Sequence, residues 1–372
     1  MSVPAAGAVS ATVVRDAQRP PLVMRCGAFG DMVLLTVLLE QLYARFGQPA
    51  DVIASGPWSQ PLLAGHRAVG RMFLLRSRRT PYWLSLTQRR LVAWLRARGP
   101  GPTWFCDRGE GRELLARGGV PAAYVCDSTG YPFVDGENFA DRYLRLGALT
   151  PGAFAGLLPP AVAGVPRAAR LEVPEVGRLE LEEWLVRCGL GGRSYLVIHP
   201  GSRHVARRRF RARSGASKYW PEERWAEVVR GVRAHRPDLA IVFSGTGAEG
   251  AFIADVLRLA GVSDTLNAAN DLPARRLLPL LERAHSLIAV DTGPAHAAAA
   301  LNCPTVALFG HIDPWLYRPG GATTPAATLT GTVDGKPNIL GIEPAQVIEA
   351  WLTLTGLHTT TVRRDSVKST DR

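Results

Sequence analysis

Short apolar runs separated by helix-length segments are the feature that most constrains the fold of this chain. Residues 287–310, LIAVDTGPAHAAAALNCPTVALFG, show the pattern in one piece, with two apolar runs on either side of an alanine-rich segment. Runs of this kind are typical of parallel strands that are buried on both faces and joined by a crossover helix. The polar cluster after the first run then lies at the carboxyl end of a strand, where open α/β sheets bind ligands.

The same alternation occurs in both halves of the chain. The expected strands are residues 22–26, 51–55, 71–75, 103–107, 122–126, 195–199, 239–244, 286–290 and 304–310. Helices are expected over 31–46 and 221–235, from about 248, from 273, and over 343–354. Two such halves predict an α/β protein of two Rossmann-like, doubly wound domains facing a central cleft.

The length of 372 residues also favours two domains, because a single core seldom grows that large. A stretch rich in Pro, Gly and Ala begins near residue 149 and predicts a linker. The expected division is a flexible leader over 1–20, a first domain over 21–150, a linker over 151–176, a second domain over 177–342, a helix over 343–356 that packs back on the first domain, and a flexible tail over 357–372.

The composition excludes several classes of protein. No apolar stretch approaches the roughly 20 residues of a membrane-spanning helix, and no signal-peptide pattern is expected at the N-terminus. The five cysteines are scattered without a CxxC or Cys/His cluster, which argues against a zinc site or a disulfide framework and favours a reducing compartment. The formal net charge of +12 favours a polyanionic partner, such as nucleic acid, an anionic membrane or a phosphorylated substrate.

In each half, one polar cluster follows the first expected strand. In RCGAFGDMVLL, Gly27 and Gly30 permit a tight turn, and Asp31 begins a helix, where a carboxylate that merely caps the helix is the alternative. In the second half, HPGS with Gly201 precedes a basic loop that ends at Lys218, just before the helix start WPEE. A lysine near a helix start suits a diphosphate, whereas the arginines of the loop 203–213 are equally explained as a solvated surface.

Two more clusters follow later strands. SGTGAEG, residues 244–250, formally matches the GxGxxG dinucleotide fingerprint, although no acidic partner is clearly placed on the next strand. Its Glu249 could accept hydrogen bonds from ribose hydroxyls, or could be a solvated helix-start residue. Asp291-Thr292-Gly293 caps a helix whose free N–H groups form an anion site, and His296 adds a donor there or is a buried structural histidine. GxxxxGK[ST], DxD, HExxH and GxSxG do not occur in the sequence.

Together these clusters resemble the family 9 glycosyltransferases, the ADP-heptose:lipopolysaccharide heptosyltransferases of Gram-negative bacteria. The matching pieces are RCGAFGDMVLL, the HPGS…KYWPEERW segment, SGTGAEG and DTGPAHAAAALNCPTVALFGHIDP, in this order and spanning residues 22–356. The resemblance implies a GT-B fold and inverting transfer that needs no metal and no cofactor besides the nucleotide-sugar donor. It also implies a lipopolysaccharide-core or related glycan acceptor, and a cytoplasmic location that includes the cytoplasmic face of the inner membrane.

The resemblance also assigns roles to individual residues. Asp31 matches the catalytic base, and Lys218 matches the lysine that holds the donor diphosphate. Glu249 resembles the carboxylate that binds the donor ribose, and Leu272 falls where an apolar residue touches adenine. The remaining matches are Asp291, Thr292, Gly293 and His296 at the donor-binding helix start, and Ser214 as a hydroxyl residue near the phosphates. The loop 203–213 is longer and richer in arginine than the family pattern.

Two alternatives to a sugar transferase come from other classes of protein. One is an oxidoreductase that binds a dinucleotide at GTGAEG, and the other is a non-catalytic polyanion-binding protein. Within the transferase reading, the arginines between residues 76 and 98, beside Trp83 and Trp94, favour an anionic acceptor or an anionic leaflet over nucleic acid, and a solvated basic helix is the alternative.

Overall fold

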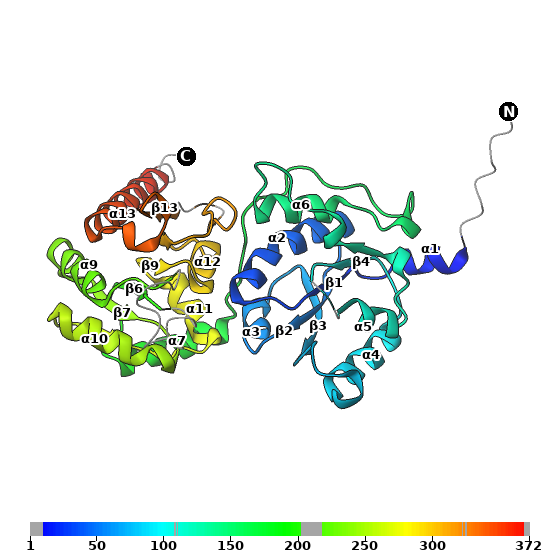
Figure 1. Cartoon of the computed structure of the whole chain (residues 1–372), viewed down its shortest axis with the longest axis horizontal. Helices are drawn as coiled ribbons and strands as arrows, with labels where there is room; N and C mark the ends of the chain where they lie inside the picture. The colour runs from blue at the N-terminus through cyan, green and yellow to red at the C-terminus, as the bar shows by residue number, and fades with distance from the viewer. Residues whose placement is uncertain are drawn as a thin grey trace. The chain divides into compact units, whose positions relative to one another are not determined.

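The computed structural model describes residues 10–107, 109, 111–201, 218–321, 323 and 326–367, with side chains described as far as residue 356. The chain divides into two compact units. The first contains residues 1–28 and 34–167, and the second contains residues 29–33 and 168–372. Each unit is a parallel sheet with helices on both faces (Figure 1).

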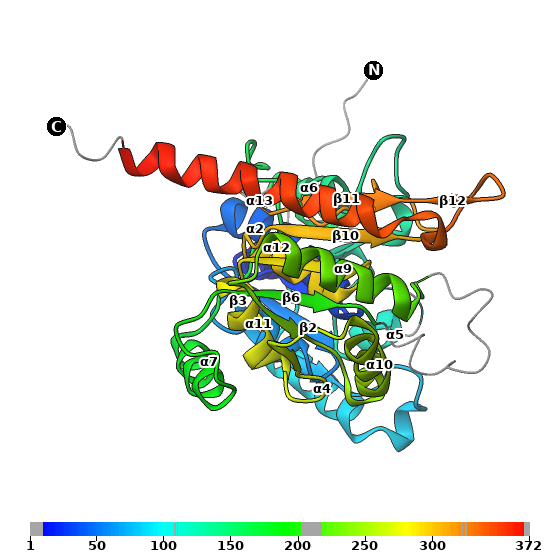
Figure 2. The ribbon, with the colours of Figure 1, turned by 90° about the vertical axis from the view of Figure 1, so that its left-hand side faces the viewer.

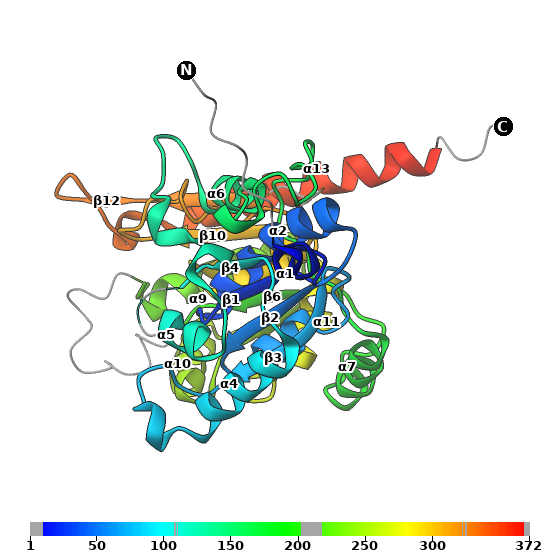
Figure 3. The ribbon, with the colours of Figure 1, turned by 90° about the vertical axis from the view of Figure 1, so that its right-hand side faces the viewer.

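The sheet of the first unit has the order β3-β2-β1-β4-β5, and all its strand pairs are parallel. The strands of this unit can be followed in Figure 3. Its strands are β1 (Leu22–Arg25), β2 (Ala50–Ser55), β3 (Val69–Leu75), β4 (Thr103–Phe105) and β5 (Val125–Asp127). Its helices are α1 (Ala11–Ala17), α2 (Phe29–Phe46), α3 (Ser59–Leu63), α4 (Leu86–Arg98), α5 (Gly111–Arg117) and α6 (Phe139–Ala148).

The core of the first unit forms between the sheet and the helices α4 and α5. Met24 and Phe105 on the strands are fully buried against Leu91 and Leu95 of α4. The helix α4 shows why the sequence favours a helix here, since Ser85 accepts a hydrogen bond from the N–H of Gln88 and caps the first turn. Its buried leucines recur four residues apart, so they line one face of the helix.

The sheet of the second unit has the order β11-β10-β9-β6-β7-β8, again with parallel pairs throughout. Its strands are β6 (Tyr195–His199), β7 (Ala240–Phe243), β8 (Thr265–Asn267), β9 (Ser286–Val290), β10 (Thr305–Phe309) and β11 (Ala326–Thr330). Its helices are α7 (Glu175–Arg187), α9 (Glu222–His235), α10 (Gly250–Ala260), α11 (Ala274–Arg283), α12 (Gly293–Ala300) and α13 (Pro344–Val367). A two-stranded hairpin of β12 (Thr332–Val333) and β13 (Lys336–Pro337) precedes α13.

The final helix differs from its predicted position. The sequence predicts that residues 343–356 pack on the first domain, but α13 packs along β10 and β11 and against α9 of the second unit (Figure 2). Its Val347 and Trp351 are fully buried in the core of that unit, and the indole N–H of Trp351 donates to the hydroxyl of Ser286 at 2.9 Å. Because that helix face is apolar, the sequence shows that it is buried but not on which sheet.

The predicted boundaries also need correction at the ends of the chain and at the linker. Residues 11–17 of the expected leader form α1, and the carboxylate of its Asp16 is buried and accepts a hydrogen bond from the hydroxyl of Tyr124 at 3.2 Å. The expected linker, 151–176, includes Phe154, which is buried in the core of the first unit, and its last two residues lie within α7. The helix α13 continues to Val367, into the range expected as a flexible tail.

One predicted strand begins later than expected, and two strands of the second sheet were not predicted. In 122–126, residues 122–124 form a short 3-10 helix, and the strand β5 begins only at Val125. The strands β8 and β11 were not predicted, because neither combines a continuous apolar run with full burial. Both lie at edges of the sheet, where one side of a strand has no neighbour.

Candidate functional site

Three polar clusters meet at the carboxyl edge of the second sheet. The sheet order places β9, β6 and β7 side by side, and the connections run in opposite directions from the gap between β6 and β9. That gap is the topological switch point, where open α/β sheets bind ligands. His199 ends β6, Asp291 follows β9 directly, and Glu249 lies in a 3-10 helix (Gly247–Glu249) after β7.

Lys218 and Asp291 form a partly buried ion pair at the switch point. The ammonium group of Lys218 lies 2.8 Å from the Oδ2 atom of Asp291 and donates to its backbone carbonyl at 2.6 Å. Burial of Asp291 by itself raises the pKa of its carboxyl, but the neighbouring His296 ring and the Lys218 ammonium outweigh burial and lower it. The carboxylate is therefore ionised at neutral pH and holds the lysine at the start of α12.

The first turn of α12 is left open to an anion. Thr292 occupies the N-cap position, yet its hydroxyl donates to the carbonyl of Val290 at 3.0 Å and does not cap the helix. His296, which is 5% exposed, lies one turn further on, with its Nε2 atom 3.8 Å from the Oδ1 atom of Asp291. Its Nδ1 atom is buried and has no hydrogen-bond partner among the described residues. The N–H of Gly293 and the nearby ammonium together suit a phosphate group, whereas Pro294 has no N–H and the N–H of Ala295 donates to the carbonyl of Thr292 at 3.1 Å.

Glu249 presents one carboxylate oxygen without a partner. Its Oε2 atom accepts hydrogen bonds from the N–H and the hydroxyl of Thr246, at 2.6 and 2.9 Å. Its Oε1 atom is buried and has no partner among the described residues, although the residue is only 2% exposed. A buried carboxylate oxygen without a donor is costly, so this arrangement points to a ligand that brings hydroxyl or N–H donors.

Gly201 and His199 form the wall beside Glu249. A Cβ atom at Gly201 would lie 2.3 Å from Oε1 of Glu249, so only glycine leaves the carboxylate in place. The Nδ1 atom of His199 lies 2.9 Å from the hydroxyl of Ser244. Burial lowers the pKa of His199, against the opposing charge of Glu249, so the imidazole is neutral at pH 7.

The capping by Glu249 also bears on the dinucleotide fingerprint at 244–250. In that fingerprint the glycine turn opens its N–H groups toward a pyrophosphate. Here the N–H of Thr246 is already bonded to the Glu249 carboxylate, and a carboxylate occupies the turn. This arrangement weighs against the oxidoreductase alternative.

The start of α2 belongs to the second unit and lies against α12. A Cβ atom at Gly30 would lie 2.9 Å from the Cδ2 atom of His296, and one at Gly293 would lie 2.7 Å from the ring of Phe29. Both glycines are thus required by close approach. Asp31 is half-buried in the first turn of α2, one residue after Gly30, while Gly27 lies in the turn between β1 and α2.

Leu272 and Ser214 complete the predicted set. Leu272 is half-buried in the turn between β8 and α11, at the same edge of the sheet. The neighbouring Asp271 accepts a hydrogen bond from the indole N–H of Trp184 at 2.5 Å, which fixes the turn. Ser214 and the arginine-rich loop 203–213 lie outside the described residues.

The first unit has its own polar cluster at the corresponding edge, and the sequence analysis missed its central carboxylate. Asp107 accepts a hydrogen bond from the N–H of Cys26 at 3.1 Å and pairs with Arg78 at 2.5 Å. It joins the ends of β1 and β4, the switch point of this sheet. The signal was present, because Asp107 directly follows an apolar run, but we expected it inside the strand. Burial raises the pKa of Cys26 to about 12, so its thiol is no nucleophile.

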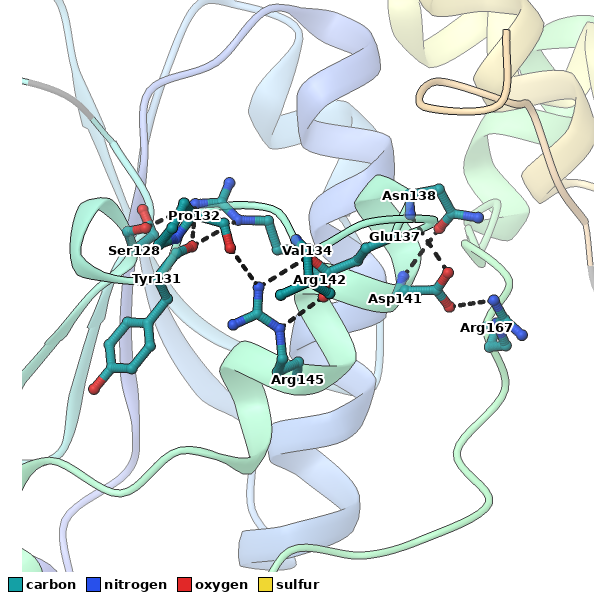
Figure 4. A network of polar contacts seen from close by, with 10 residues as sticks. All are labelled: Ser128, Tyr131, Pro132, Val134, Glu137, Asn138, Asp141, Arg142, Arg145 and Arg167. Carbon is teal, nitrogen blue, oxygen red and sulfur yellow. Dashed lines mark hydrogen bonds and ion pairs between the residues drawn. The ribbon is translucent and has the colours of Figure 1, made fainter. Parts of the chain in front are cut away.

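A second arginine network orders the loop after β5 (Figure 4). Arg145 pairs with Glu137 at 2.7 Å, and Glu137 accepts a hydrogen bond from the N–H of Val134 at 3.1 Å. Arg142 donates to the carbonyls of Ser128 and Tyr131 at 2.7 and 3.0 Å. These bonds hold loop 131–138 to α6 at the carboxyl edge of the first sheet.

Two kinds of feature were not found among the described residues. Within the described ranges, no group of three or more His, Cys, Asp or Glu side chains is placed to hold a metal ion. A search of the same residues finds no helix with the length and apolar character that crossing a membrane requires.

The fold is that of the GT-B glycosyltransferases. The glycosyl transferase family 9 structure from Veillonella parvula superposes with a TM-score of 0.71 at 18% identity, covering 91% of this chain and 97% of that one. The ADP-heptose lipopolysaccharide heptosyltransferase II of Escherichia coli superposes with a TM-score of 0.68 at 20% identity, covering 91% and 99%. The predicted fold class is therefore confirmed.

A family model matches part of the second unit. Residues 187–331 match the model of glycosyltransferase family 9 (heptosyltransferase), so the predicted resemblance to this family is confirmed. Lipopolysaccharide heptosyltransferase 3 of Escherichia coli is 28% identical over 128 residues. That match spans about a third of each protein, 34% of this chain and 34% of the relative.

Proposed function

We propose that this protein is an inverting glycosyltransferase that moves a sugar, heptose from ADP-heptose in the first instance, onto a lipopolysaccharide core or a related glycan. The observation that carries the proposal is the edge of the second sheet, where one ion pair, one uncapped helix start and one unpartnered carboxylate oxygen lie together. The matched family and the names of its relatives support a nucleotide-linked heptose as the donor.

The described residues fit the two ends of such a donor. The diphosphate binds the Lys218 ammonium and the N–H of Gly293 at the start of α12, because both are positively polarised donors at short range. The ribose binds Glu249, whose Oε1 atom accepts from a hydroxyl group. Leu272 lies at the same edge for the adenine, and Asp291 both holds the lysine and faces the sugar.

The transfer step needs a base for the acceptor and stabilisation for the leaving group. By the family resemblance, Asp31 accepts the proton of the acceptor hydroxyl as that oxygen attacks the anomeric carbon from the face opposite the diphosphate. The anomeric carbon–oxygen bond to the diphosphate breaks, and inversion follows. Lys218, the Gly293 N–H at the start of α12 and His296 then stabilise the charge that develops on the departing ADP.

In this proposal, positive groups of the protein neutralise the leaving diphosphate in place of a metal ion. In many nucleotide-sugar enzymes a divalent ion neutralises the leaving diphosphate, and here the Lys218 ammonium and the start of α12 lie where that charge is needed. The acceptor, the inner-membrane location and the identity of the donor base follow from the resemblance and are part of the proposal.

A ligand and turnover panel tests the proposal. Purified protein is melted with ADP-, GDP-, UDP- and dTDP-sugars, with and without EDTA, and turnover of ADP-heptose is followed with lipopolysaccharide-core acceptors. We expect ADP and ADP-heptose to raise the melting temperature equally with and without EDTA, and the product to have the inverted anomeric configuration by NMR. Stabilisation only by a different nucleotide, or only with divalent metal, would refute the donor or the metal-free step.

The variant Asp31→Asn separates chemistry from binding. We expect it to lower kcat by about 10²- to 10⁴-fold, the usual contribution of a general base, while ADP affinity stays within about twofold of the parent. Loss of ADP binding to the same extent as loss of turnover would show that Asp31 has another role.

A further inference from the structure

The segment between β3 and α4 exposes large apolar side chains next to a group of arginines. Trp83 is 72% exposed, the highest value among the large apolar side chains of the described residues, and Leu84 and Leu86 are 58% and 53% exposed. Figures 1 and 3 show this segment projecting from the rest of the first unit beside α4. We call it the η1–α4 surface, and it consists of Arg76, Arg79, Trp83, Leu84, Leu86, Arg89 and Arg90.

The exposure is built into an ordered segment. Residues 82–84 form the 3-10 helix η1 (Tyr82–Leu84), and the side-chain amide of Gln88 donates to the carbonyls of Ser77 and Thr80 at 3.0 and 2.7 Å. Gln88 itself is buried, and the ring of Tyr82 packs under the guanidinium of Arg117 at 4.7 Å. These contacts hold the apolar side chains outward, so their exposure is not that of a frayed loop.

The charge of this region is strongly one-sided. Between Asp51 and Asp107 the sequence has nine arginines and no acidic residue. Four of these arginines pair with carboxylates of the first unit, namely Arg67, Arg71, Arg78 and Arg98, and Arg96 donates to a backbone carbonyl. The other four are exposed, have no ion-pair partner among the described residues, and flank the apolar side chains: Arg76, Arg79, Arg89 and Arg90.

Two of these arginines lie near the start of α4. Arg89 and Arg90 follow the first turn of the helix, which contains no acidic residue. The preceding turn therefore supplies no carboxylate that could pair with them, and an anionic partner from outside would.

We propose that the η1–α4 surface docks on the headgroup layer of a bilayer that contains anionic phospholipid. Tryptophan and leucine side chains enter the boundary between headgroups and acyl chains, and arginine guanidinium groups bind the phosphates around them. The inference deepens the inner-membrane location included in the proposed function, because it names the surface that would make the contact. It is argued from the exposed residues of the first unit, so vesicle binding and sugar transfer can fail separately.

A vesicle-binding experiment tests it with the full chain. Sedimentation is measured with vesicles of phosphatidylcholine and with vesicles in which part of the lipid is phosphatidylglycerol. We expect binding only to the second kind, and we expect it to weaken as salt is raised, because exposed charges are screened. Each arginine near an anionic surface contributes about fivefold in affinity, so the double variant R89Q/R90Q should bind about 30-fold more weakly. W83S should bind about tenfold more weakly, since it removes apolar area.

Matched controls come from α7, another helix with exposed apolar side chains. Val176 and Val186 are 64% and 68% exposed, but α7 carries Glu175, Glu182 and Glu183 on its surface. The variant V186S should bind vesicles as the parent does. All variants should keep the parent melting temperature within about 2 °C, because only exposed side chains change.

The outcomes are distinct. Binding of R89Q/R90Q equal to that of the parent would overturn the proposal and would place any vesicle binding elsewhere on the chain. If W83S bound vesicles as tightly as the parent, the contact would depend on charge alone and the insertion of Trp83 would be contradicted. Equal quenching of tryptophan fluorescence by brominated lipid in parent and W83S would contradict insertion as well. Parent protein that binds heparin or RNA at low salt, but not phosphatidylglycerol vesicles, would assign the surface to a different polyanion and refute the proposal.

Discussion

Replacing Lys218 by methionine should lower both the stability of the second unit and its affinity for ADP. The lysine makes two short contacts with Asp291, at 2.6 Å to the carbonyl and 2.8 Å to Oδ2, and its side chain is 24% exposed. Removing one partner of a buried ion pair costs about 3–5 kcal/mol, and water that reaches the partly exposed site reduces this to about 2–3 kcal/mol. For a unit of this size, that corresponds to a fall of about 5–10 °C in Tm.

The effect on ligand binding has a separate magnitude. A charge-assisted hydrogen bond to a phosphate contributes about 1.5–3 kcal/mol, so K218M should bind ADP about 10- to 100-fold more weakly. Isothermal titration with ADP measures this loss, and thermal melting with and without ADP identifies the transition that belongs to the second unit.

The stability lost in K218M should depend on pH in a defined direction. In the parent, the lowered pKa of Asp291 means that its ionised form stabilises the fold at neutral pH and that this contribution is lost as the pH falls through that pKa. Without the lysine, one of the two groups that offset burial is lost, so we expect the pKa of Asp291 to rise and its charge to be less well compensated at pH 7. The stability difference between parent and K218M should therefore be largest at neutral pH and should shrink as the pH falls.

Lys336 provides the matched control, because it is exposed on the β12–β13 hairpin. K336M should leave both the melting temperature and the ADP affinity unchanged. If K218M were as stable as K336M, the Lys218–Asp291 ion pair would not stabilise the second unit as we infer. If K218M lost stability but kept the ADP affinity of the parent, Lys218 would hold Asp291 without touching the donor.

Two further predictions concern close packing and a buried ion pair. A Cβ atom at Gly201 would lie 2.3 Å from the Glu249 carboxylate. The variant G201A should therefore weaken the contact of Glu249 with the ribose of ADP and lower the affinity for ADP about tenfold. The control G250A should keep the parent affinity, because its Cβ atom would lie 3.6 Å from the nearest neighbour. Unchanged titration of G201A would show that Glu249 does not bind the ligand. Asp51 is buried, and its guanidinium partners outweigh burial and lower its pKa, so D51N should cost about 3–5 kcal/mol at pH 7 by denaturant unfolding. In the parent, the stabilisation by ionised Asp51 is lost as the pH falls below about 4, so the unfolding free energies of parent and D51N should converge there. A difference in unfolding free energy that stays constant down to about pH 3 would contradict this prediction.

The sequence allowed much of the fold to be predicted because burial on both faces leaves a continuous apolar run. The strands β6, β9 and β10 fall where they were predicted, and each is fully buried. The two edge strands of the second sheet were missed, since β8 and β11 are only partly buried and their residues do not form such a run. The leader prediction was wrong for α1, because the hydrogen bond between Asp16 and Tyr124 joins residues 108 positions apart.

The candidate site was predictable at the level of residue types but not of contacts. Glycines and carboxylates directly after apolar runs indicated ligand binding, because such residues gather at the carboxyl edge of a parallel sheet. The unpartnered Oε1 atom of Glu249 and the buried Asp107 were not predicted, since both depend on which side chains are brought near them. The role of each site residue stays a prediction that the variants above test.

By itself, the sequence determined that this chain has two parallel α/β halves and which short segments lie at the edge where ligands bind, because the period and length of apolar runs are local properties. Only the tertiary structure decided that Lys218 pairs with Asp291 across 73 positions, that α13 packs on the second sheet, and that Trp83 is held outward. Those outcomes depend on strand order and on the packing of distant segments, which no local pattern of residues records.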